Sequence, residues 1–113
     1  MVVYNETRGL PVATRARLAK TFWRRFRGLM GWTSLDVGEG LIIDPCNGVH
    51  TWFMRFSIDV FHVGEDGRVL RVLRNMRPWR LGPVVRGSRY VVETAAGTAL
   101  ATGTHEGDIL ALD

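Results

Sequence analysis

A chain of 113 residues with 46% hydrophobic and 23% charged residues has the size and composition of one globular domain with one core. This composition excludes a disordered chain, and a core of this size requires neither disulfides nor metals for folding. The single cysteine, Cys46, excludes an internal disulfide and a cysteine-based zinc cluster within the chain. The net charge is +4 and only Lys20 of the fifteen basic residues is lysine, an excess of arginine that codon drift or a polyanionic partner would both explain.

Residues 1–16 lack the basic start, continuous apolar segment and small-residue cleavage site of a signal peptide. No apolar run approaches the roughly 20 residues of a membrane span. We therefore expect a cytoplasmic protein without a membrane span. No internal repeat, low-complexity tract or linker divides the chain, so residues 1–113 are expected to form a single domain.

Short apolar strands are expected at residues 2–4 and 12–19, separated by a turn-prone stretch. The strongest helix signal follows at residues 21–30, with Thr21 as N-cap and Gly31 as the favoured end. Its spacing predicts an amphipathic helix with one apolar stripe and arginines on the remaining face. The stripe consists of Phe22, Trp23, Phe26, Leu29 and Met30.

A strand at residues 41–43 precedes the most informative feature, two apolar-rich runs at residues 49–63 and 68–73. They are joined by Gly64-Glu65-Asp66-Gly67, which predicts a β-hairpin. Prolines and glycines make residues 75–89 a surface loop. A strand is expected at residues 90–94, a short helical or turn segment at 95–101 and a last strand at 108–112.

These elements indicate a β-rich α+β fold, arranged as a single compact barrel-like or strongly curved sheet with one main helix. The alternation in residues 51–63 places apolar side chains on both faces, so this run is expected to be a central strand covered on both sides. Arg55 and Asp59 fall on one face but roughly 13 Å apart, too far for an easy direct salt bridge. Each is expected to find another partner.

Three isolated charges in apolar strands are candidates for a ligand-binding cleft. Arg55 could recognise a carboxylate or phosphate, or pair with Glu93, a lone acid in another apolar strand. Asp59 could be a carboxylate with a shifted pKa, or it could cap a turn or pair with an arginine such as Arg89.

His50 lies four residues after Cys46, a spacing that could bring a thiolate near an imidazole. Neither oxyanion donors nor a group that orients the histidine can be identified, so a buried cysteine and a hydrogen-bonded histidine are favoured. No histidine pair has recognised ligand spacing, and no metal or cofactor is expected.

Arginines recur every three residues from position 68 to position 80, a period that aligns on no regular element. A polyanion could still meet the flexible part of this region, with a tryptophan available for base stacking. A charged strand edge that resists aggregation is the alternative. The polyanion-binding candidates are Arg74, Arg77, Trp79, Arg80 and Arg86.

The ordered motifs of the chain resemble domain-of-unknown-function family 192, a family of small prokaryotic proteins. They are Gly28-Leu29-Met30, Gly40-Leu41, His50-Thr-Trp-Phe-Met-Arg-Phe56, Ile58-Asp59-Val60, Gly67, Glu93, Gly97 and Gly107-Asp108. The resemblance covers residues 10–112 and departs at Ser57, where many relatives have proline. It implies a compact β-rich domain with signature positions at Met54, Asp59 and Glu93, and it brings no assigned reaction.

Three functions remain open. The favoured one is a noncatalytic ligand- or protein-binding module whose cleft at residues 50–63 holds a small anionic ligand or a protein partner. The alternatives are a small enzyme with a carboxylate general base and an anionic substrate, and nucleic-acid binding through residues 68–89. The ligand-binding candidates are His50, Trp52, Arg55, Asp59 and Glu93.

Overall fold

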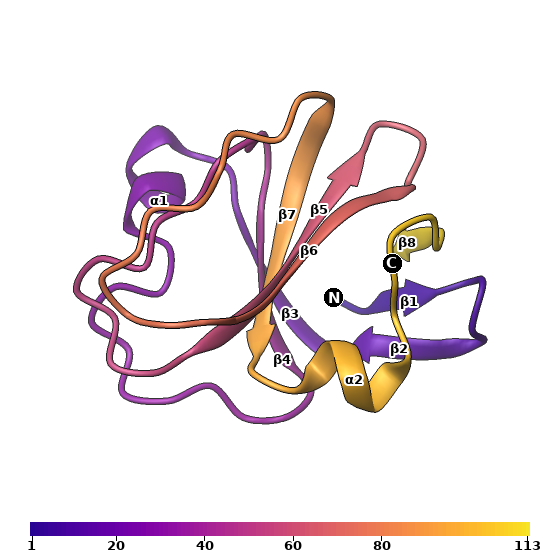
Figure 1. The fold of residues 1–113 in the computed structure, drawn as a ribbon, viewed down its shortest axis with the longest axis horizontal. Helices are drawn as coiled ribbons and strands as arrows, with labels where there is room; N and C mark the ends of the chain where they lie inside the picture. Colours follow the sequence, from indigo (N-terminus) through magenta and orange to yellow (C-terminus); the bar gives the residue numbers. More distant parts are fainter.

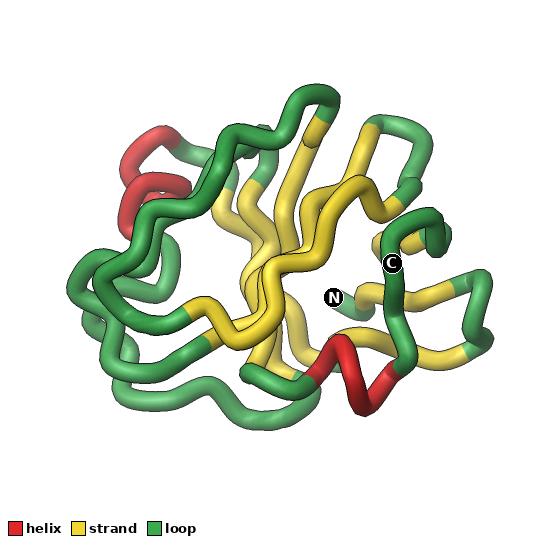
Figure 2. Tube along the Cα trace, in the orientation of Figure 1, coloured by secondary structure: helices red, strands yellow, loops and turns green.

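In a computed structural model that describes residues 1–113, the strands form two separate sheets (Figures 1 and 2). The larger sheet has the order β3 (Arg15–Ala19), β4 (Glu39–Ile43), β7 (Ser88–Ala95), β5 (Ile58–Gly64) and β6 (Val69–Met76), and the smaller has the order β2 (Leu10–Ala13), β1 (Val3–Asn5) and β8 (Leu110–Leu112). Two short helices, α1 (Phe22–Arg27) and α2 (Thr98–Thr102), complete a β-rich α+β fold. Neither sheet closes on itself, so the barrel-like arrangement is not confirmed.

Strand β5 is the centre of the core, and every one of its residues is buried. It pairs antiparallel with β6 and β7, and the β5–β6 pair is the hairpin predicted from Gly64 to Gly67. Apolar clusters cover both of its faces, as the sequence predicted for a central strand. One cluster, which includes Phe61 and Val63, joins β5 to the smaller sheet, and the other, which includes Ile58 and Val60, lies on the opposite face.

The prediction of a nearly continuous strand over residues 49–63 is wrong for its first half. Residues 51–57 form an irregular loop, in which Thr51 and Met54 are buried while Trp52 and Phe53 face outward. Phe53 has a φ of 59°, which no strand residue adopts. The predicted strand at 12–19 is likewise two strands, β2 and β3, which belong to different sheets.

Helix α1 lies on the connection between β3 and β4, which pair in parallel, and this crossover carries it over one face of the larger sheet (Figure 1). The Thr21 hydroxyl accepts a hydrogen bond from the Arg24 N–H at 3.2 Å, which confirms the predicted N-cap. The helix ends at Gly28, with φ 49°, and not at Gly31. No residue of α1 is buried, so Phe22, Trp23 and Phe26 of the expected apolar stripe face outward, whereas Leu29, which follows the helix, is buried in the core. Neither helix is long and apolar enough to cross a membrane.

Candidate functional site

Asp59 and Glu93 lie on opposite faces of the larger sheet. Across the β5–β7 pair Asp59 is opposite Thr94 and Val60 is opposite Glu93. Directly opposite residues share a face and successive residues alternate, so the two carboxylates point apart. Glu93 faces the end of α1, because a Cβ on Gly28 would lie 3.5 Å from Glu93 Oε1. A cleft that holds both acids, as the sequence suggested, does not form.

Asp59 connects β5 to α2 through backbone hydrogen bonds. Its Oδ2 accepts from the N–H groups of Gly97 and Ala99 at 3.1 and 2.9 Å, and its Oδ1 accepts from the N–H of Asn75 at 2.8 Å. The residue is 2% exposed. With three donors on its two oxygens, Asp59 acts as the turn cap that the sequence offered as one of its alternatives.

Glu93 is a buried acid without a partner. Its side chain is 2% exposed, its Oε1 has no hydrogen-bond partner, and it takes part in no ion pair. Burial raises the pKa of Glu93 to about 8. At neutral pH the carboxyl group is therefore mostly protonated, and it can both donate and accept a hydrogen bond.

A cleft between α1 and residues 45–50 leads toward this carboxyl group. Its open part has a volume of about 440 Å³ and lies between the Phe22–Phe26 side of α1 and the segment from Pro45 to His50. A neck of about 30 Å³ continues inward to Glu93 and shares Arg25, Phe26 and His50 with the open part. A neck of this size holds a water molecule or a slim ligand group. We refer to the open part and the neck together as the Glu93 cleft.

His50 is a rigid wall of the Glu93 cleft. The Trp52 N–H donates to its Nδ1 at 3.2 Å, so the neutral ring carries its proton on Nε2, which donates to the Phe26 carbonyl at 3.1 Å. Its ring packs between those of Phe26 and Trp52, with centroids 5.3 and 4.7 Å away. Because both ring nitrogens are occupied, His50 positions the wall and is not free to act as a base.

Cys46 also lines the cleft, as a protonated thiol. Its Sγ–H donates to the Gly48 carbonyl at 3.1 Å, and burial raises its pKa, which disfavours the thiolate. On the same face of the sheet, His62 Nδ1 is 3.0 Å from the Ser88 hydroxyl, which donates to the Cys46 carbonyl at 2.9 Å. No group of three or more His, Cys, Asp or Glu side chains is placed to hold a metal ion.

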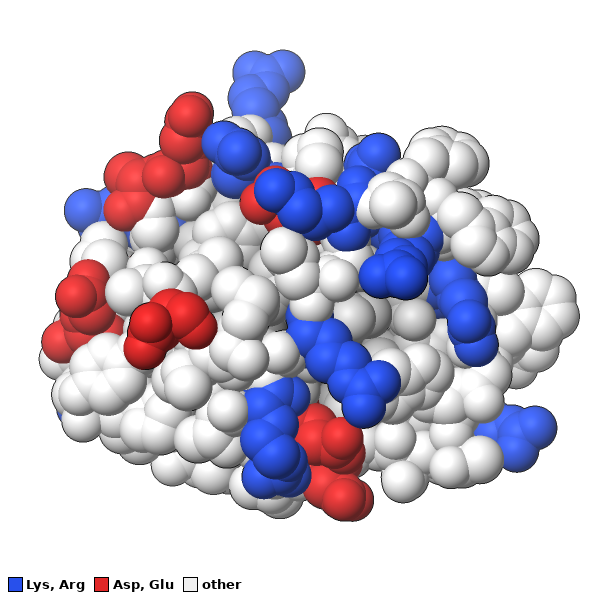
Figure 3. All heavy atoms as spheres, turned by 180° about the vertical axis from the view of Figure 1, so that it is seen from behind, with Lys and Arg blue, Asp and Glu red and all other residues white.

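The remaining candidates lie at the surface. Arg55 is exposed in the 51–57 loop and takes part in no ion pair, so it does not reach Glu93. Arg77, Trp79, Arg80 and Arg86 are exposed on residues 77–87, whereas Arg74 lies on β6 and pairs with Glu106 at 3.6 Å. In Figure 3 most acidic residues lie on the half of the molecule away from α1, while basic residues and exposed rings gather toward the α1 end.

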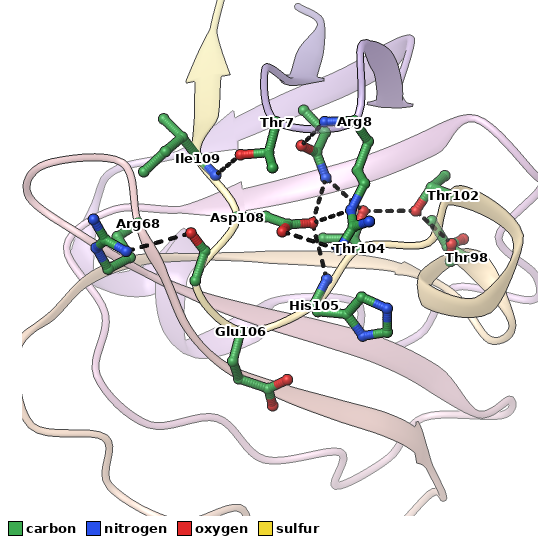
Figure 4. A network of polar contacts seen from close by, with 12 residues as sticks. Thr7, Arg8, Arg68, Thr98, Thr102, Thr104, His105, Glu106, Asp108 and Ile109 are labelled. Carbon is green, nitrogen blue, oxygen red and sulfur yellow. Dashed lines mark hydrogen bonds and ion pairs between the residues drawn. The ribbon is translucent and has the colours of Figure 1, made fainter.

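A second polar cluster, shown in Figure 4, is fully used in holding the smaller sheet. Asp108 accepts hydrogen bonds from the side chains of Arg8 and Asn5 and from the His105 N–H, at 3.0 to 3.4 Å. Burial favours the neutral acid, but these bonds hold the pKa of Asp108 below its usual range. These contacts tie the buried Asp108 carboxylate to the smaller sheet and to the residues before β8.

The structure thus brings His50 and Glu93 together in the cleft, with Trp52 packed on the His50 ring, and places Arg55 and Asp59 away from Glu93. Sequence reasoning missed the contributions of Arg25, Phe26 and Gly28, because they meet Glu93 only once β7 pairs between β4 and β5. The available signal was the Gly28-Leu29-Met30 motif, in which a glycine follows an aromatic helix. A glycine there permits the positive φ that ends α1 beside Glu93.

Comparison with known proteins identifies relatives of unknown function. The family model DUF192, described as an uncharacterized family, matches residues 3–112. A UPF0127 protein of Thermococcus sibiricus is 32% identical over 85% of this chain and 64% of its own length, and one of Thermococcus gammatolerans is 30% identical over 99% of this chain and 75% of its own length. This chain therefore spans less than two thirds of the first relative. The crystal structure of a protein of unknown function from Novosphingobium aromaticivorans superposes on this chain with a TM-score of 0.88 at 27% sequence identity. The superposition covers 98% of this chain and 83% of that protein's chain.

Proposed function

The chain belongs to domain-of-unknown-function family 192, which has no assigned activity, so we propose a function from the site alone. The proposed function is that of a noncatalytic module that binds a small ligand in the Glu93 cleft. The observation that carries this proposal is the Glu93 carboxyl group, which is buried without a hydrogen-bond partner at the inner end of the neck. Buried polar groups without a partner are rare in folded proteins and call for a ligand or a water molecule.

The lining of the cleft describes the ligand. The rings of Phe22 and Phe26 offer an apolar wall for its body, and the narrow neck admits only a slim end group. That end group must hydrogen-bond to a carboxyl group that is neutral below about pH 8. A hydroxyl or amide end meets this requirement at neutral pH, and an ammonium end meets it once Glu93 ionises.

The chemistry around Glu93 favours binding over catalysis. The Cys46 thiol is protonated, and both ring nitrogens of His50 are occupied by backbone groups. The cleft therefore contains neither an activated nucleophile nor a free imidazole base. A binding site needs neither.

Four-carbon probes that differ only in their end group test the proposal. We expect butanol to perturb the carboxyl ¹³C resonance of Glu93 at about pH 6 and butylammonium to do so at about pH 10, while butyrate has no effect at pH 10, where Glu93 is also negatively charged. In the variant Glu93→Gln, the resonances of Phe26 and His50 should keep their response to butanol and lose their response to butylammonium. If none of the probes perturbs Glu93 together with Phe26 and His50, the cleft is not a ligand site.

A second candidate function, an enzyme with Glu93 as its general acid or base, draws support from the raised pKa. A carboxyl group with a pKa of about 8 can exchange protons near neutral pH. Arg25, which lines both parts of the cleft, would replace Arg55 as the group that holds an anionic substrate. Exchange of the carbon-bound protons of butanone for deuterium, measured with the wild type and Glu93→Gln, separates the two candidates: enhanced exchange that needs Glu93 supports the enzyme.

A further inference from the structure

One end of the molecule is both strongly apolar and strongly basic. It is formed by residues 20–30, 46–57 and 76–88, which we call the basic end, and these segments contain no aspartate or glutamate. Its cations are Lys20, Arg24, Arg25, Arg27, Arg55, Arg77, Arg80 and Arg86. Its exposed large apolar side chains are Phe22, Trp23, Phe26, Trp52, Phe53, Trp79, Leu81 and Val84.

The three segments form one continuous surface, at the α1 end of the molecule in Figure 1. The His50 ring packs against Phe26 of α1, and a β-bridge joins His50 to Leu81. The ring of Phe53 packs against that of Trp79, with centroids 4.6 Å apart. No cation of the basic end takes part in an ion pair, so its charge is free to meet a partner.

Phe53 and Trp79 hold their rings outward at a conformational cost. Both residues have positive φ, 59° and 63°, a region that bulky residues rarely adopt. Their side chains are 60% and 58% exposed, so burial in the core does not offset this strain. The fold thus keeps two exposed aromatic residues in a strained backbone conformation. This indicates that their side chains contact the surface of a partner.

The arrangement of the rings distinguishes among partners. Phe26 stacks between Trp23 and His50, His50 packs between Phe26 and Trp52, and Phe53 meets Trp79 at 59°. Each of these rings has another ring against one side, which leaves fewer open faces than a run of stacked nucleic-acid bases needs. The exposed Leu81 and Val84 also offer a base no stacking surface. The surface is therefore better suited to an apolar layer than to single-stranded nucleic acid.

Charge disfavours a second copy of the chain as the partner. A two-fold dimer through the basic end would place the same cations against one another with no acid between them. The partner must carry negative charge beside an apolar region. A bilayer of anionic lipids has both, with phosphates at the surface and acyl chains below.

We propose that the basic end docks onto the surface of an anionic lipid bilayer. Phe53, Trp79 and Leu81 enter the headgroup region, and the arginines on the same loops, Arg55, Arg77 and Arg80, meet the lipid phosphates. These six docking residues do not line the Glu93 cleft, although the cleft opens on the same end of the molecule, and the docking does not depend on a ligand in the cleft.

Sedimentation with vesicles tests the proposal. The protein should bind vesicles that mix phosphatidylcholine with phosphatidylserine, should bind phosphatidylcholine vesicles weakly, and should dissociate as salt is raised. The double variant Phe53→Gly/Trp79→Gly removes both rings at positions where glycine is unstrained, and it should bind more than tenfold more weakly. The triple variant Arg55→Gln/Arg77→Gln/Arg80→Gln should lose about fivefold per arginine.

The matched control is Leu100→Ala/Arg68→Gln, which changes an exposed leucine and an exposed arginine outside the basic end and should bind as the wild type does. Quenching of wild-type tryptophan fluorescence by brominated lipids reports insertion without any variant. The proposal is overturned if the glycine double variant binds as tightly as the wild type, if a single-stranded oligonucleotide binds more tightly than vesicles, or if the protein only self-associates.

Discussion

Gly28 and Glu93 meet where helix α1 ends on the larger sheet: a Cβ on Gly28 would lie 3.5 Å from Glu93 Oε1. The contact brings a helix without any buried residue to a deeply buried acid. The stability of the fold and the ionisation of Glu93 are therefore expected to be coupled at this point.

The pH dependence of stability should reveal Glu93. Burial raises its pKa to about 8 from an ordinary value of 4.5, so between these values the folded state binds a proton that the unfolded state does not. The contribution of Glu93 to stability therefore falls as pH rises through this window, by up to about 5 kcal/mol, and is constant above it. Urea unfolding of wild type and Glu93→Gln at several pH values should show similar stability near pH 5 and a more stable variant near pH 9. A constant difference between the two proteins would contradict the assignment.

Replacement of Gly28 should alter both stability and the titration of Glu93. Gly28→Ala places a side chain at φ 49°, ψ −126°, which should cost about 1 to 3 kcal/mol. The new methyl group should also shift the Glu93 titration seen by NMR, because it contacts the carboxyl group. Gly31→Ala is the control: its φ is also positive, but no atom lies within 4 Å of its Cβ position, so Glu93 should titrate as in the wild type.

Asp59 should prove structural. Asp59→Asn keeps the shape but faces its NH₂ group toward backbone N–H donors, and we expect a loss of about 2 to 4 kcal/mol in the free energy of unfolding. Since Asp59 lies on the face of the sheet opposite Glu93, the resonances of Phe26 and His50 should remain in place. A variant of unchanged stability with an altered Glu93 cleft would reverse this assignment.

His62 should destabilise the fold in acid. Burial lowers its pKa to about 4, with a smaller contribution from the nearby charge of Arg71. Below the ordinary value of 6.5 the unfolded state binds a proton that the folded state does not, so the contribution of His62 to stability falls as pH drops from about 6.5 to about 4. His62→Asn keeps a donor toward Ser88 but does not titrate. The wild type should therefore lose stability relative to the variant as pH drops through this window. The unfolding midpoints of both proteins, measured at several pH values between about 6.5 and about 4, check this expectation.

The sequence predicted the features that depend on local chemistry. The Thr21 N-cap, the turn from Gly64 to Gly67 and the buried run of β5 all follow from the residue types at those positions. The break at residues 51–57 could not be predicted in this way. The residue types of this run are those of a strand, because most are large and apolar, but in the folded chain only Thr51 and Met54 of the loop are buried.

The candidate site was predictable only in part. Glu93 was recognisable as a lone acid in an apolar strand, and His50 as a hydrogen-bonded histidine. Whether Asp59 or Arg25 shares a site with Glu93 depends on the register of β5 with β7 and on the path of α1, which are set by pairing between distant segments. Local patterns contain no information about that pairing.

The pairing of β1 with β8 has a consequence for biosynthesis. Residues 3–5 lie beside residues 110–112, so during translation β1 has only β2 as a neighbour until the rest of the fold has been made. Until then, one edge of β1 stays open and the apolar face it shares with Phe61 and Val92 lacks part of its cover. Slower synthesis is therefore expected to prolong the exposure of this strand edge and of the apolar face behind it.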